Sequence, residues 1–175
     1  SLMASGRFRG QMKKLCALYA LSTLLYLPLA WYAGLLPHGL GALARMVLLD
    51  GTFYHLWYFP AAIVGCLLTA LLLDRFGLRV ALVASGALYL VGLFGDSYYG
   101  ATAGIEAVRG AYDVLFNGMD YTRNGLFYAP LFLVMGAALA KRGAKRPTGA
   151  KAALGLAVCL AALLVEGGLV HALGW

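Results

Sequence analysis

Long apolar runs limit what this chain can fold into more than any other feature of its sequence. A bilayer core of ~30 Å is crossed by about 20 apolar residues in a helix that rises 1.5 Å per residue. Runs bounded by charged or turn-forming residues cover about 15–34, 53–73, 80–95, 125–140 and 152–173. The sequence therefore predicts an all-α, polytopic membrane bundle, with about five transmembrane helices in a single domain, 1–175.

Composition supports the same class of protein. Hydrophobic residues make up 62% of the chain and charged residues 12%, whereas soluble domains carry about a quarter charged residues. The 23 glycines favour helices that pack through small residues over a membrane barrel. Each cysteine stands alone in an apolar run, without the spacing of a metal site. We expect no metal, and cysteines that act as small buried hydrophobes.

The positions of lysine and arginine predict the orientation, because cationic segments stay on the cytoplasmic side during insertion. With the N-terminus inside, eleven of the fourteen basic residues are cytoplasmic. They are Arg7, Arg9, Lys13, Lys14, Arg75, Arg79, Lys141, Arg142, Lys145, Arg146 and Lys151. This places the protein in the inner (cytoplasmic) membrane. The net charge of +7 then indicates membrane lipids as partners rather than nucleic acid.

Two connecting segments are expected on the outer side. Residues 36–50 are too short to span and fit a turn or helix along the interface. Residues 96–124 form the long extracytoplasmic loop and hold four of the seven acidic residues. Loops longer than about 15 residues are commonly functional. The alternative is a partly helical surface excursion.

Polar and aromatic residues gather at the outer ends of these helices. Trp57 and Tyr58 suit an interfacial aromatic belt, whereas His55 needs a partner, in a binding site or in the bundle, unless it lies at the interface. Arg123 departs from the positive-inside pattern. We expect a carboxylate such as Asp120 or Asp96, or an anionic ligand, to hold it.

Glu166 is the one carboxylate within an apolar run. It lies ~22 Å along the helix from Lys151, where a charge costs a few kcal/mol unless it is paired or protonated. We expect it to face the bundle interior. All these features lie in the outer half of the membrane, which predicts one polar cavity open to the outside. The candidate substrate-binding residues are His55, Trp57, Tyr58, Asp96, Tyr98, Arg123, Asn124 and Glu166.

The order of these motifs resembles the integral-membrane acyltransferases of type three, which O-acylate cell-surface sugars and other extracytoplasmic acceptors. The matching segments are Ser-Gly at 5–6, Phe-Tyr-His-Leu-Trp-Tyr at 53–58, Leu-Tyr-Leu-Val-Gly at 88–92, Arg-Asn-Gly-Leu-Phe at 123–127, and Glu166. Residues 51–58 and 95–100 are most similar to the membrane domain attached to serine racemases of vancomycin resistance, which is thought to supply serine. The resemblance implies a larger bundle, of which this chain is the middle portion.

The resemblance leaves the catalytic residues unassigned. The family's proposed catalytic histidine and its partner arginine lie upstream of the Ser-Gly at 5–6, and His55 does not match that position. The main expectation is an enzyme, a membrane O-acyltransferase that moves an acyl group from a cytoplasmic thioester such as acyl-CoA to an extracytoplasmic hydroxyl acceptor. No cofactor would stay bound. His55, Arg123 and Asn124 would bind the acceptor.

A transport domain for serine or another small solute is the alternative. Arg123 would then meet a carboxylate and Glu166 an ammonium group. An inactive fragment of a longer bundle is the third possibility.

Overall fold

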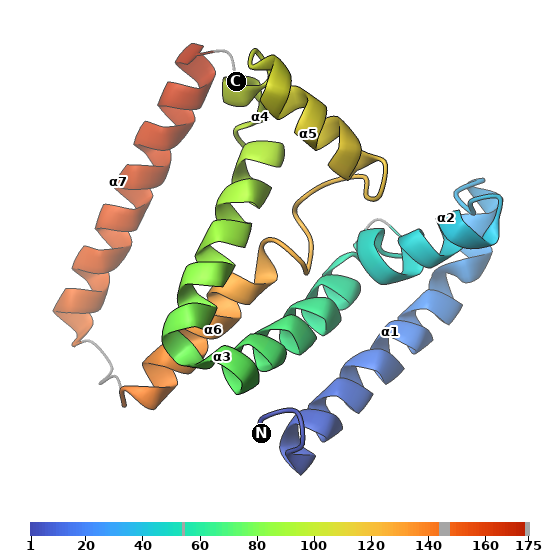
Figure 1. The fold of residues 1–175 in the computed structure, drawn as a ribbon, viewed down its shortest axis with the longest axis horizontal. Helices are drawn as coiled ribbons and strands as arrows, with labels where there is room; N and C mark the ends of the chain where they lie inside the picture. Colours follow the sequence, from blue (N-terminus) through green and yellow to red (C-terminus); the bar gives the residue numbers. More distant parts are fainter. Residues whose placement is uncertain (54, 144–147, 174–175) are drawn as a thin grey trace.

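The computed structural model describes residues 1–53, 55–143 and 148–173, and every regular element in these ranges is helical (Figure 1). This confirms the predicted all-α fold. The elements are α1 (Gly6–Tyr32), α2 (Leu40–Arg45), the π-helical turn η1 (Met46–Asp50), α3 (Tyr58–Gly95), α4 (Tyr99–Thr102), α5 (Glu106–Phe116), α6 (Ala129–Lys141) and α7 (Gly149–Leu173).

Among the described residues, three helices are long and apolar enough to cross a membrane: α1, α3 and α7. Helix α3 has 38 residues and is broken at Gly77, whose φ of 74° and ψ of 176° are not helical. Glycine adopts such a positive φ without a steric penalty. The predicted second and third helices are thus two arms of α3, the first arm (58–76) and the second arm (78–95). Figure 1 shows the chain reversing between them.

Helix α6 packs against α3 through small residues. A Cβ added to Gly65 on the first arm would lie 2.5 Å from the Ala129 Cβ, and one on Gly92 of the second arm would lie 2.7 Å from the Tyr128 ring. Glycine therefore permits this close approach. Pro130 and Val134 of α6 are fully buried there. The helix predicted at 125–140 corresponds to α6, which begins at Ala129, four residues later than predicted. At 13 residues, α6 is too short to count among the spanning helices.

The segment between α3 and α6 is fixed to the end of the second arm. In a continuous helix the Asp96 N–H would donate to the Gly92 carbonyl oxygen, but here it donates to the Leu93 carbonyl oxygen. The Gly92 carbonyl oxygen instead accepts a 2.7 Å hydrogen bond from Thr122 Oγ1. The Tyr112 hydroxyl donates to the Val91 carbonyl oxygen at 2.7 Å. Helices α4 and α5 occupy much of the predicted loop 96–124, so this segment is partly helical.

Helix α1 is joined to the rest of the protein through the residues just before it and through its middle. Near its start, the Asp74 carboxylate accepts hydrogen bonds from Ser1 Oγ and from the N–H groups of Leu2 and Met3. Further along, the Tyr19 hydroxyl donates to the Val47 carbonyl oxygen at 2.9 Å. These contacts tie α1 to the kink of α3 and to η1.

Most described basic residues gather at one end of the molecule, which we call the basic end. It comprises Arg7, Arg9, Lys13, Lys14, Arg75, Arg79, Lys141, Arg142 and Lys151. The start of α1, the α3 kink, the end of α6 and the start of α7 all lie there (Figure 1). Lys145 and Arg146, predicted to share this side, lie outside the described residues. The grouping fits the predicted topology; the side of the membrane stays a prediction.

Candidate functional site

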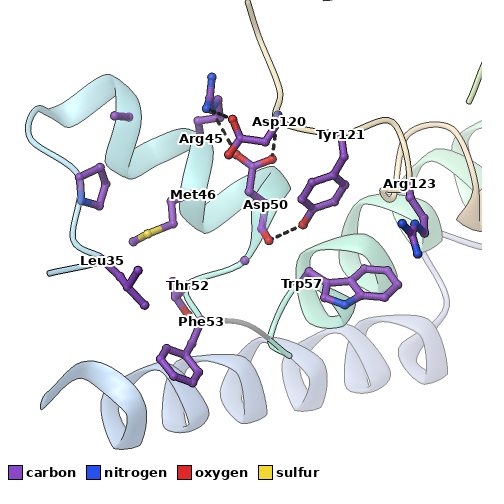
Figure 2. A pocket seen from close by; sticks show the side chains of 13 residues that line it. Leu35, Arg45, Met46, Asp50, Thr52, Phe53, Trp57, Asp120, Tyr121 and Arg123 are labelled. Carbon is purple, nitrogen blue, oxygen red and sulfur yellow. Dashed lines mark hydrogen bonds and ion pairs between the residues drawn. The ribbon is translucent and has the colours of Figure 1, made fainter. Parts of the chain in front are cut away.

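A charged pocket of about 670 Å³ lies between the end of α1, α2 and the start of α3, at the opposite end of the molecule from the basic end (Figure 1). Figure 2 shows it from close by. Its walls come from the turn after α1, from α2 and η1, from the segment leading into α3, and from the segment leading into α6. The lining residues are Leu35, Pro37, Ala42, Arg45, Met46, Asp50, Gly51, Thr52, Phe53, Trp57, Asp120, Tyr121 and Arg123.

One wall holds a guanidinium between two carboxylates. Arg45 Nε lies 3.2 Å from Asp50 Oδ2, and Arg45 Nη2 contacts Asp120 Oδ1. The Asp120 N–H also lies 3.4 Å from Asp50 Oδ1. The Asp50 side chain is 10% exposed and that of Asp120 is 58% exposed. Two carboxylates with one guanidinium leave this wall with a net negative charge, and Asp120 presents it to water.

Burial raises the pKa of the Asp50 carboxyl, and the neighbouring Asp120 charge acts in the same direction. The Asp120 N–H and the Arg45 guanidinium oppose this by stabilising the carboxylate. Tyr121 completes the wall, because its hydroxyl donates a 2.5 Å hydrogen bond to the Asp50 backbone carbonyl. Burial also raises the pKa of Tyr121, to about 12.

Arg123 forms the second charged part of the pocket. Its Nε lies 3.1 Å from Asp96 Oδ2, which confirms the predicted carboxylate partner. The Arg123 side chain is 60% exposed, and that of Asp96 only 18%. In the view of Figure 2, Tyr121 and Trp57 are drawn between the two carboxylates and the Arg123 guanidinium. The pocket therefore carries an accessible carboxylate and an accessible guanidinium at separate points.

Asn124 is buried and bonded within its own turn. Its Oδ1 accepts from the N–H groups of Leu126 at 2.9 Å and Phe127 at 3.3 Å. Its Nδ2 donates to the Tyr121 carbonyl oxygen at 3.0 Å and contacts Met119 Sδ at 3.3 Å. These bonds set the start of the segment that leads into α6. A role for Asn124 in substrate binding stays a prediction.

The remaining candidates are not brought together as expected. Trp57 lines the pocket, whereas His55 and Tyr58 are exposed and do not. Tyr98 and Glu166 line a second hollow of about 480 Å³ beside α7. The prediction of one shared cavity is therefore wrong, because a common depth in the membrane does not fix lateral position. The Tyr98 hydroxyl donates to Glu166 Oε1. The expectation that Glu166 faces the bundle interior is wrong for the described residues, because Glu166 is exposed and α7 has no buried residue.

Sequence reasoning missed Arg45, Asp50 and Tyr121 as site residues. Arg45 carried the same signal as Arg123, a cation on the side where few cations are expected. Tyr54, part of the predicted aromatic motif, lies outside the described residues. Within 1–53, 55–143 and 148–173, no group of histidine, cysteine, aspartate and glutamate side chains suits a metal ion.

Three apolar helices of spanning length fit a polytopic membrane protein, and the charged pocket lies at one end of its described part. Two *Enterococcus faecalis* proteins named amino-acid racemase are similar to this chain, at 42% identity over 147 residues and 40% over 131. These matches cover 83% and 71% of this chain, and 21% and 18% of the two relatives. No family model and no solved structure matches.

A serine/alanine racemase of *Enterococcus gallinarum* is 39% identical over 162 residues, which is 91% of this chain and 23% of the relative. The chain thus spans about a fifth of the length of the curated relatives it matches. Their names agree with the racemase branch of the resemblance found in the sequence, and none of the three is named an acyltransferase.

Proposed function

We propose that this chain is a membrane domain that binds serine, or another small amino acid, in the charged pocket and passes it across the membrane to a racemase. The observation that carries this proposal is the pair of accessible, opposite charges on Asp120 and Arg123 in one pocket. The racemase names of the relatives support it.

The two charges match the two ends of an amino acid. A planar guanidinium binds a carboxylate through two parallel hydrogen bonds, so Arg123 would take the substrate carboxylate. The ammonium group would bind Asp120. Each accessible group already has an ionic partner, Arg45 for Asp120 and Asp96 for Arg123. The substrate would add a charge of the opposite sign to each exposed group, and Arg45 would keep its contact with Asp50.

Acyl transfer, the main expectation from the sequence, receives less support. It requires a base within hydrogen-bond reach of the acceptor hydroxyl. By the resemblance, this base would lie upstream of residues 5–6, and none of the three similar proteins is named an acyltransferase. The acyltransferase reading, with acyl-CoA as co-substrate, stays a prediction.

Uptake measurements on full-length protein in proteoliposomes test the proposal. Arg123→Ala should lower the uptake of labelled L-serine by about tenfold or more, because hydrogen bonds to charged groups contribute about 1.5–3 kcal/mol. Arg109→Ala is the matched control, since Arg109 is exposed on α5 and does not line the pocket. Equal losses in the two variants would contradict the proposal. Transfer of labelled acetyl without serine uptake would favour the acyltransferase instead.

A further inference from the structure

We infer that Glu166, together with Tyr98, is a proton-binding site that couples the uptake of the amino acid to the entry of a proton. This inference rests on the proposed transport function. It names a second substrate, the proton, and a place for it outside the charged pocket.

Glu166 is exposed on the apolar helix α7, where its neighbours are apolar and it has one polar partner. It is the only acidic residue in α7, and the hollow around it is lined by Ala161, Ala162, Val165, Leu169, Val170 and Leu173 besides Tyr98. The Tyr98 hydroxyl donates to Glu166 Oε1. Beyond Tyr98 lie Tyr89 and Tyr128, and on α7 itself His171 follows five residues later. Among the described residues that line this hollow there is no cation to hold the carboxylate.

A lone carboxylate in a membrane helix is a suitable proton carrier. The charged form is costly in apolar surroundings, and the neutral acid is far less so. The tyrosine hydroxyl lowers the cost of the charged form, because a hydrogen bond to a carboxylate is stronger than one to a neutral acid. Protonation of Glu166 would therefore weaken its hydrogen bond with the Tyr98 hydroxyl.

The same short turn connects Glu166 to the charged pocket. Tyr98 and Asp96 are separated by Ser97 alone, and this turn directly follows the second arm of α3. On one side Asp96 pairs with Arg123, and on the other Tyr98 pairs with Glu166. Ser97 Oγ lies 3.4 Å from Asp96 Oδ2 and 3.5 Å from the Tyr128 hydroxyl. A shift of this turn on protonation of Glu166 would change how firmly Asp96 holds Arg123.

One proton would enter and leave through Glu166 in each transport cycle. A proton from the outer solution binds the Glu166 carboxylate to give the neutral acid, and the acid releases it to the inner solution. The amino acid crosses as a zwitterion without net charge. Each cycle therefore moves one positive charge inward, and both an acid exterior and a negative interior drive accumulation.

The test uses full-length protein in proteoliposomes with labelled serine. A gradient of one pH unit, acid outside, supports up to about tenfold accumulation. Glu166→Gln should lose this accumulation, and should retain the exchange of internal unlabelled serine for external labelled serine, which needs no net proton movement. Glu166→Asp, which keeps a titratable group, should retain both. Asp113→Asn is the matched control, because Asp113 is exposed on α5, away from both hollows.

The outcomes separate the two proposals. Gradient-driven accumulation by Glu166→Gln equal to that of the natural protein would overturn the proton site. So would accumulation that a protonophore leaves unchanged, or a Glu166→Gln protein that loses exchange as well. If the natural protein shows neither exchange nor accumulation of any amino acid, the transport function itself is wrong, and the proton site falls with it.

Discussion

Neighbouring residues of one sequence cluster have different tasks in this structure. Arg123 and Asn124 are adjacent and are equal candidates from the sequence. Arg123 is exposed to the pocket, whereas the Asn124 side chain is buried and bonded to four groups of its own turn. A sequence shows which side chains can bind a ligand. It does not show which of these side chains are already hydrogen-bonded to the backbone.

Asn124→Ala should destabilise the fold without a change of pocket charge. The substitution removes the acceptor for two N–H groups and the donor for one carbonyl, and the loss of such a cap costs about 0.5–2 kcal/mol. We expect a lower midpoint of thermal unfolding in detergent, read by intrinsic fluorescence. Asn117→Ala is the control, since Asn117 is exposed. Equal midpoints for the two variants would contradict the capping role.

The hydrogen bond from Tyr121 to the Asp50 carbonyl predicts a pH dependence. The folded-state pKa, about 12, is above the ordinary value of 10.0. The stability that this hydroxyl contributes is therefore fully present below about pH 10 and declines as the pH rises toward 12. The difference in unfolding midpoint between the natural protein and Tyr121→Phe should be constant from pH 7 to 9 and shrink at higher pH. A difference that grows above pH 10 would rule out this protonated donor.

At the scale of elements, apolar runs located the helices correctly and their ends poorly. The charged residues Asp74, Arg75 and Arg79 read as a loop in the sequence, because they end an apolar run. In the structure they continue the helix on both sides of Gly77, which alone departs from helical geometry. The two predicted helices, 53–73 and 80–95, correspond to the two arms, and helical structure extends closer to Gly77 than the apolar runs indicate.

The contact between the first arm and the start of the α6 segment can be tested at Gly125. A Cβ added there would lie 2.5 Å from the Ala61 carbonyl oxygen, a backbone atom that cannot move aside. Gly125→Ala should lower the free energy of unfolding by about 1–3 kcal/mol, the usual cost of overpacking. Gly136→Ala on α6 has open space around the added methyl and serves as control. Urea titration in micelles measures both; a Gly125→Ala protein as stable as the control would disprove the tight contact.

At the scale of the whole molecule, the sequence predicted that charged groups pair on one side of the protein, but not which distant segments form each hollow. The departure of Arg123 from the positive-inside pattern indicated a carboxylate partner, and Asp96 is that partner. The pairing of Arg45 with Asp120 joins residues 75 positions apart, and no local pattern encodes such a distance. The second hollow, with Tyr98 and Glu166, depends on how α7 lies beside the second arm, which periodicity does not specify.

The break at Gly77 also sets the directions of the two arms of α3. Each arm of α3 extends about 27 Å from this glycine, and the charged pocket and the Tyr98 turn lie near the far tips of the two arms. A rotation of ten degrees at Gly77 would displace a tip by roughly 5 Å at that arm length. The backbone angles of one glycine at the basic end therefore determine how far apart the charged pocket and the Tyr98 turn lie at the opposite end.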